Sequence, residues 1–325
     1  MRFASSRPNQ RSIVEAPMSI EGPRRDALRV AIALVVGATV FSGAFLLDWR
    51  PPPLPVSMAT IAPGEPSADC AALLRIGQPS EPHEISTDQG LRVMVRTPIN
   101  YESDRPYPLI VVYPPAQFDR FSSERFYNMT TEATRRGMIV AYSDYKPLSV
   151  RAVALQAAVA ASVAARFCID VSRITYFGHS DGGAMAEGIP GMVPTTLRPH
   201  VIVASGAGIT NEDLSHGHCV AEVNVMIIHN RDDAKFPDFG RGTAAYWAQC
   251  AACRPRDLSA RDIACQKFEG CAHGIAVMYC HVDELHEKWP GIEGPALDFI
   301  ESANQQVPRG GSTTSTRPQV SDDPQ

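Results

Sequence analysis

A short segment near the middle of the chain places a serine in a setting that could make it a nucleophile. Residues 178–182 read Gly-His-Ser-Asp-Gly and lie between an apolar run and an alanine-rich one. Glycines on both sides of a serine are typical of a sharp turn from a strand into a helix, where the backbone passes too close for a Cβ. Residues 173–177 favour the strand and residues 184–187 the helix. The segment therefore predicts that Ser180 is a nucleophile.

A serine hydroxyl attacks a carbonyl group only when a base takes its proton, and a carboxylate usually fixes the tautomer of that base. In proteins built around this type of turn, the acid follows the serine in the chain and the histidine comes last. An apolar run that ends at Ile228 continues into a polar loop with Asp232 and Asp233. Either aspartate could be the acid, and residue type and position leave the choice open.

Three histidines near the carboxyl end are candidates for the base: His273, His281 and His286. His281 lies within 276–282, an apolar segment expected to be a strand, where a structural role is more common. His273 precedes that strand. His286 follows it on a loop at the strand's carboxyl end, where α/β sheets present functional groups. Position therefore favours His286.

Apolar and β-branched runs predict the strands that would position these residues. Besides the strand before Ser180, they lie at 91–96, 108–113, 139–142, 201–204 and 223–228. Residues from Ser149 to Phe167 contain no Gly or Pro and predict one long helix with Ser149 as its cap. Residues 293–301 predict a closing helix. Because strands alternate with helical stretches, we expect a mostly parallel sheet with helices on both faces.

The amino-terminal part of the chain has the composition of a membrane segment. No charged residue occurs between Val30 and Leu47, a run long enough to cross a bilayer. Arginines are frequent before this run and rare just after it, so the amino end should stay in the cytoplasm and the rest should be exported. A cleaved signal peptide is the alternative, although residues 42–47 make a poor processing site.

Changes in composition along the chain indicate its organisation. We expect a cytoplasmic segment (1–26), a transmembrane anchor or signal peptide (27–47), a proline-rich linker (48–69), a folded domain (70–303) and a disordered tail (304–325). The net charge of −5 argues against a nucleic-acid partner, and no Lys/Arg cluster follows an element that could recognise one.

Eight cysteines form an even set, which in an exported protein predicts disulfide bonds. They are Cys70, Cys168, Cys219, Cys250, Cys253, Cys265, Cys271 and Cys280. Eight cysteines allow 105 pairings, so the sequence assigns none of them. A zinc site around Cys250 and Cys253 is the alternative, but the later spacings provide no second close pair.

Three segments of the chain, around Ser180, Asp233 and His286, resemble one family, the exported polyhydroxybutyrate depolymerase and feruloyl-esterase-like group of α/β-hydrolases. The resemblance runs from about Leu91 to Ile300. Residues 173–186, RITYFGHSDGGAMA, are similar to the family's nucleophile turn, and residues 286–291, HEKWPG, are similar to its histidine segment. Residues 227–233, IIHNRDD, are similar to its acid loop. The resemblance implies an α/β-hydrolase fold.

The resemblance also implies a catalytic triad of Ser180, His286 and Asp233, because the family's aspartate stands four residues after the histidine of its acid loop. Backbone N–H groups of Asp181 and Ala116 would hold the oxyanion. Two departures bear on activity: Pro-Pro precedes Ala116 where the family has His-Gly, and a leucine precedes His286 where the family has glycine. Proline donates no hydrogen bond, and the loss of one oxyanion donor lowers the rate about 10²–10³-fold.

The residues and the resemblance together predict a serine esterase. Its substrate would be a small ester or oligoester, such as a hydroxyalkanoate oligomer or a feruloyl- or acetyl-type ester, cleaved through an acyl-enzyme without a metal or an organic cofactor. The catalytic domain would lie in the periplasm or outside the cell, anchored to the membrane or secreted after signal cleavage. One alternative is a catalytically silent, membrane-anchored module of the same fold, which the two departures favour. The other is an envelope acyltransferase or a peptidase.

Overall fold

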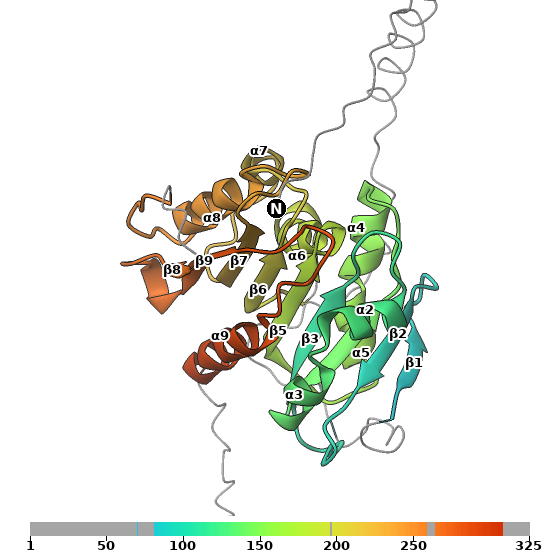
Figure 1. The fold of residues 1–325 in the computed structure, drawn as a ribbon. Helices are drawn as coiled ribbons and strands as arrows, with labels where there is room; N and C mark the ends of the chain where they lie inside the picture. Colours follow the sequence, from blue (N-terminus) through green and yellow to red (C-terminus); the bar gives the residue numbers. More distant parts are fainter. Residues whose placement is uncertain (1–69, 71–80, 196, 259–263, 308–325) are drawn as a thin grey trace, which may run out of the picture. The chain divides into compact units, whose positions relative to one another are not determined.

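The computed structural model describes residues 70, 81–195, 197–258 and 264–307 (Figure 1). These residues belong to the unit Ala59–Gln325. The predicted cytoplasmic segment, membrane anchor and linker lie outside the described residues, as does most of the predicted tail. Within the described ranges, no helix is both long and apolar enough to span a membrane.

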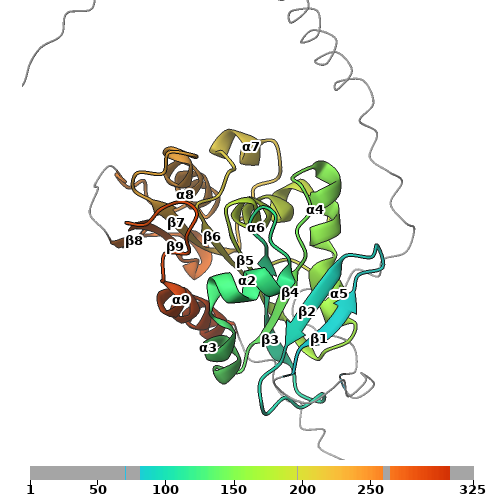
Figure 2. The same cartoon turned by 45° about the vertical axis from the view of Figure 1, so that its right-hand side comes forward.

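One nine-stranded sheet forms the centre of the domain, with the strand order β1-β2-β4-β3-β5-β6-β7-β9-β8. The strands are β1 (His83–Ser86), β2 (Arg92–Arg96), β3 (Tyr107–Tyr113), β4 (Ile139–Ser143), β5 (Ile169–His179), β6 (Val201–Ser205), β7 (Asn224–Asn230), β8 (Cys265–Lys267) and β9 (Val277–Val282). From β4 to β9 in this order the strands run parallel. β1 and β2 at one edge and β8 at the other run antiparallel to their neighbours (Figure 2). The prediction of a mostly parallel sheet is confirmed.

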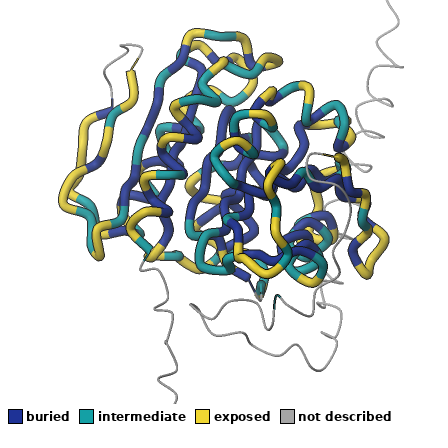
Figure 3. Tube along the Cα trace, turned by 90° about the horizontal axis from the view of Figure 1, so that it is seen from below, coloured by how far each residue is buried: buried dark blue, intermediate teal, exposed yellow. Residues whose placement is uncertain are grey.

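Helices cover both faces of the sheet. One face carries α4 (Val150–Ala157), α5 (Val159–Ala164), α6 (Asp181–Met192), α7 (Asn211–Ser215) and α8 (Phe239–Cys250), and the other carries α2 (Arg120–Tyr127), α3 (Thr130–Arg135) and α9 (Glu293–Gln306). Successive strand residues face opposite sides, so Leu109 and Val111 of β3 join the first core and Ile110 and Val112 join the second. Figure 3 shows that buried positions follow the strands through the middle of the domain.

The single long helix expected to begin at Ser149 is two helices, α4 and α5. The cap is as predicted, because Ser149 Oγ accepts a hydrogen bond from the N–H of Ala152 at 3.1 Å. α4 ends at Ala157, and the next residue, Ala158, has a ψ of −11° that departs from the helical value of about −42°. Alanine and valine suit the helix on both sides of this turn, so they give no signal for it. α9 extends past residue 303, the expected end of the domain, to Gln306.

All eight cysteines are paired, which confirms the expected disulfides and rules out the zinc alternative at these residues. The bonds are Cys70–Cys168, Cys219–Cys250, Cys253–Cys271 and Cys265–Cys280. The last of these joins facing residues of β8 and β9. Four disulfides indicate that the domain folds in an oxidising compartment, such as the periplasm or the extracellular space.

Candidate active site

The turn between β5 and α6 has the close approach that its glycines predict. Ser180 has φ 55° and ψ −121°, a backbone conformation that is strained for a residue with a side chain. A Cβ on Gly178 would lie 2.1 Å from the backbone O of Gly182, and a Cβ on Gly182 would lie 2.2 Å from the backbone O of Tyr113. The N–H of Ser180 donates to the backbone O of Ser205 at 2.8 Å. Glycine is therefore required on both sides of the serine, which lies at the carboxyl edge of the parallel strands.

The structure brings Ser180, His286 and Asp233 together. Ser180 Oγ lies 3.0 Å from His286 Nε2, and His286 Nδ1 lies 2.7 Å from Asp233 Oδ2. The other carboxylate oxygen of Asp233 accepts the backbone N–H groups of Lys235 and Phe236 at 2.9 and 3.0 Å. Because Nδ1 of the imidazole donates to the carboxylate, Nε2 presents a lone pair to the serine hydroxyl.

The other candidates from the sequence lie outside this chain of contacts. The side chain of Asp232 is 76% exposed to solvent, whereas that of Asp233 is 1% exposed. His281 is part of β9. His273 lies in the short turn η2 (Ala272–Gly274) that precedes β9. Of the two aspartates that the sequence left open, Asp233 contacts the imidazole of His286.

The carboxyl group of Asp233 is held in its charged form. Burial by itself would raise the pKa of Asp233, but the hydrogen bond from His286 and those from the backbone N–H groups of Phe236 and Lys235 outweigh this effect. The pKa of Asp233 therefore lies below its usual value. An ionised carboxylate at this place stabilises a positive charge on the imidazole of His286.

Two further histidines support the site, and the sequence analysis did not single them out. Nε2 of the buried His179 donates to the backbone O of His286 at 2.7 Å, and Nε2 of His229 donates to the backbone O of Phe236 at 2.9 Å. Burial lowers the pKa of both rings, to about 4 for His179. Both rings therefore stay neutral at pH 7, where each fixes the loop that carries His286 or Asp233.

The two expected oxyanion donors lie on adjoining segments. Asp181 is the first residue of α6, where backbone N–H groups have no partner within the helix. Ala116 is an exposed residue of the loop between β3 and α2, residues 114–119, which is called the donor loop below.

A buried tyrosine, Tyr127 of α2, connects the donor loop with the serine turn. Its hydroxyl donates to the backbone O of Tyr113, directly before the loop, at 3.1 Å. The same hydroxyl accepts the N–H of His179, directly before the serine, at 2.7 Å. Burial raises the pKa of Tyr127 well above its usual value, so the hydroxyl keeps its proton. The sequence gives no local signal for this role, because Tyr113 and His179 lie 14 and 52 residues away from Tyr127.

An open groove of about 600 Å³ borders the loops that carry the acid and the base. Residues 232–235 and 283–287 line it, and most of their side chains are charged or polar. Asp233 and His286 are both part of the lining.

The chain is similar in fold to solved structures. An acetyl xylan esterase from Aspergillus awamori matches with a TM-score of 0.51 and 13% identity, over 68% of this chain and 99% of the esterase. The fold is α/β-hydrolase-like. A dipeptidyl peptidase 4 from Porphyromonas gingivalis has a TM-score of 0.48 at 16% identity, over 69% of this chain and 35% of that protein. An esterase from Thermogutta terrifontis has a TM-score of 0.47 at 14% identity, over 70% of this chain and 92% of that one.

The sequence itself matches no family model and no curated protein. At the identities above, the likeness to solved structures concerns the fold alone.

Proposed function

We propose that this protein is a serine hydrolase that cleaves carboxylic esters. The observation that carries the proposal is the continuous chain of hydrogen bonds from Ser180 Oγ through His286 to Asp233, at 3.0 and 2.7 Å. Strained backbone conformations cost stability and cluster at active sites, which is consistent with the conformation of Ser180. The lowered pKa of Asp233 supports the role of a charged partner for the imidazole.

The reaction follows from these contacts. His286 Nε2 takes the proton of Ser180 while Oγ attacks the ester carbonyl carbon, and Asp233 stabilises the imidazolium that forms. N–H groups of Asp181 and Ala116 donate to the oxyanion. When the tetrahedral intermediate collapses, the bond to the alcohol oxygen breaks and His286 returns its proton to that oxygen. Water then attacks the acyl-enzyme by the same steps, which frees the acid and regenerates the serine.

The substrate we propose is a small ester or oligoester of the hydroxyalkanoate, feruloyl or acetyl type. The resemblance of residues 173–186 and 286–291 to the polyhydroxybutyrate depolymerase and feruloyl-esterase-like family supports the same class of substrate.

We also propose that residues 27–47 anchor the domain on the outer side of a membrane, with a cleaved signal peptide as the alternative. The uncharged run in the sequence and the four disulfides support export. Cell fractionation tests this part of the proposal: the anchored protein stays with the membranes until detergent is added, whereas a processed protein is found in the soluble exported fraction.

Hydrolysis of p-nitrophenyl acetate and butyrate tests the activity. We expect turnover by the wild type and a loss of at least about 10⁴-fold in Ser180→Ala. Ser215→Ala, on the exposed helix α7, is the matched control and should retain wild-type turnover. Equal activity in Ser180→Ala and the wild type would refute the serine mechanism.

A silent module of the same fold is the second candidate, because Pro114 and Pro115 provide no N–H groups in the donor loop. An inactive wild type that also resists a fluorophosphonate probe would favour it. An acyltransferase is separated from an esterase by the products formed when a second alcohol competes with water.

A further inference from the structure

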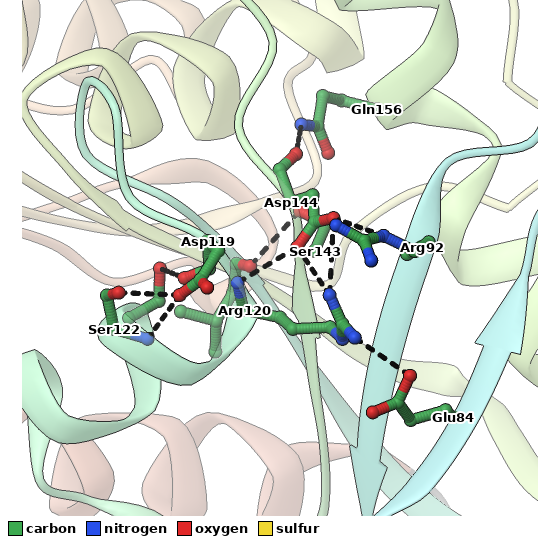
Figure 4. A network of polar contacts seen from close by, with 10 residues as sticks. Glu84, Arg92, Asp119, Arg120, Ser122, Ser143, Asp144 and Gln156 are labelled. Atoms are coloured by element: carbon green, nitrogen blue, oxygen red, sulfur yellow. Dashed lines mark hydrogen bonds and ion pairs between the residues drawn. The ribbon is translucent and has the colours of Figure 1, made fainter.

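A cluster of charged residues lies where the donor loop ends and α2 begins (Figure 4). Its centre is Asp144, the residue that follows β4. Asp144 Oδ1 accepts the backbone N–H and the Nη1 group of Arg120, both at 3.1 Å. Asp144 Oδ2 accepts Arg92 Nε at 2.9 Å, and the second amino group of Arg120 donates to Glu84 at 2.8 Å.

The pair between Asp144 and Arg120 is largely removed from solvent. The side chains are 13% and 5% exposed, respectively, whereas that of Arg92 is 62% exposed. Burial alone would lower the pKa of Arg120, but its hydrogen bonds to Asp144 and Glu84 raise the pKa above its usual value. The guanidinium therefore remains charged and bound in one geometry, and it fixes the start of α2.

The same region contacts the donor loop at a second point. The N–H of Tyr145 donates to the backbone O of Phe118 at 3.1 Å. Two consecutive residues therefore hold the end of the loop. Tyr145 contacts Phe118, and Asp144 contacts Arg120, the residue that follows the loop. Within the loop, the N–H of Phe118 donates to the backbone O of Pro115 at 3.1 Å. Pro114 and Pro115 themselves donate no backbone hydrogen bond, so the contacts from Asp144 and Tyr145 add support from outside the loop.

Tyr145 also reaches the other side of the proposed oxyanion site. Its hydroxyl donates to Asp181 Oδ2 at 3.0 Å. Burial, followed by the hydrogen bond to the Asp181 carboxylate, raises the pKa of Tyr145, so the phenol stays protonated and remains a donor. One dipeptide thus contacts both the loop that carries Ala116 and the residue that follows Ser180.

We propose that Asp144 and Tyr145 are positioning residues that set the separation between the two oxyanion donors, the N–H groups of Ala116 and Asp181. The proposal rests on the esterase function proposed above. Neither side chain reacts with the substrate. Oxyanion donors act mainly in the transition state, so misplacing one of them lowers kcat and leaves KM nearly unchanged.

Two variants test the proposal, with p-nitrophenyl acetate as substrate and an alkyl boronic acid as mimic of the tetrahedral intermediate. Asp144→Asn removes the charge that binds Arg120, and Tyr145→Phe removes only the hydroxyl that binds Asp181. Arg92→Gln is the matched control, because Arg92 contacts the same carboxylate but neither the loop nor the serine turn.

We expect kcat to fall about 10- to 100-fold in Asp144→Asn and about 10-fold in Tyr145→Phe, below the cost of losing a whole donor. KM should stay within about twofold, the boronic acid Ki should rise in proportion to the loss of kcat/KM, and Arg92→Gln should behave as the wild type. If Asp144→Asn is too unstable to purify, Tyr145→Phe decides the question, since the change removes a single hydroxyl.

A Tyr145→Phe variant with wild-type kcat and an unchanged boronic acid Ki would overturn the proposal. So would an Asp144→Asn variant whose loss of activity equals the fraction of its molecules that is unfolded. An inactive wild type, or an ester hydrolysis that persists unchanged in Ser180→Ala, would overturn the esterase function and this proposal together. An active wild type with unaffected positioning variants would overturn this proposal alone.

Discussion

Replacing Glu187 with glutamine tests how a buried carboxyl group behind the serine turn affects stability. Glu187 lies on α6 and has no solvent exposure. Trp247 Nε1 donates to its Oε2 at 2.9 Å. Burial raises the pKa of Glu187 from 4.5 to about 7, although the hydrogen bond from Trp247 opposes this change. The folded protein therefore favours the neutral carboxyl group.

The sign of the effect follows from the two pKa values of Glu187. Below pH 4.5 the carboxyl group is protonated in the folded and in the unfolded protein, so it does not lower the free energy of unfolding. Between pH 4.5 and about 7 the unfolded chain loses its proton while the folded protein retains it, so the free energy of unfolding falls as the pH rises. Above about pH 7 the free energy of unfolding stays lower by the full amount. A difference from 4.5 to about 7 corresponds to about 3 kcal/mol.

Glutamine is neutral at every pH and can still accept the hydrogen bond from Trp247. We expect Glu187→Gln to match the wild type near pH 4.5 and to be more stable by up to about 3 kcal/mol at pH 8. Urea unfolding at several pH values, followed by tryptophan fluorescence without reductant, measures this difference. Glu222→Gln, at an exposed position, is the control and should change stability by less than about 0.5 kcal/mol. A difference between Glu187→Gln and the wild type that does not vary with pH would refute the reasoning.

Three further predictions concern the site and the disulfides. Asp233→Asn should lower kcat for ester hydrolysis about 10⁴-fold, because the imidazole loses its charged partner. Asp232→Asn is the control and should stay within about twofold of the wild type. Equal losses in the two variants would contradict the assignment of Asp233. The pKa of His179 is lowered to about 4, so its contribution to stability is lost as the pH falls from about 6.5 towards 4. The free energy of unfolding of His179→Gln should lack this pH dependence. The same acid transition in the variant and the wild type would contradict a buried, neutral His179. Replacing Cys265 and Cys280 by serine, which opens a bond with a sequence separation of 15, should lower the free energy of unfolding by about 3 kcal/mol in urea titrations, and an unchanged midpoint would contradict it.

Local signals in the sequence predicted much of the fold. Strands β2 to β7 and β9 and the helix cap at Ser149 depend on residues close together in the chain, and the structure has them near the expected positions. The short edge strands β1 and β8 were not predicted. The glycines at 178 and 182 predicted the turn because their requirement is steric and acts over a few residues. The turn at Ala158 had no such signal, since alanine suits the helix on both sides of it.

The candidate site was harder to predict where it depends on distant contacts. Asp232 and Asp233 are neighbours of the same type, and only the position of His286, 53 residues after Asp233, distinguishes them in space. His179 contacts the backbone of His286 across 107 residues, and in the sequence it is only the variable residue before the serine. The triad assignment therefore stays a prediction about activity that kinetics must test.

Peptide mass spectrometry of the protein treated with a fluorophosphonate most directly tests whether Ser180 is an activated nucleophile. Our account predicts one phosphonyl adduct, located on Ser180, that is absent from Ser180→Ala and forms much more slowly in His286→Gln. An unlabelled wild type, or an adduct on another residue that persists in Ser180→Ala, would contradict it.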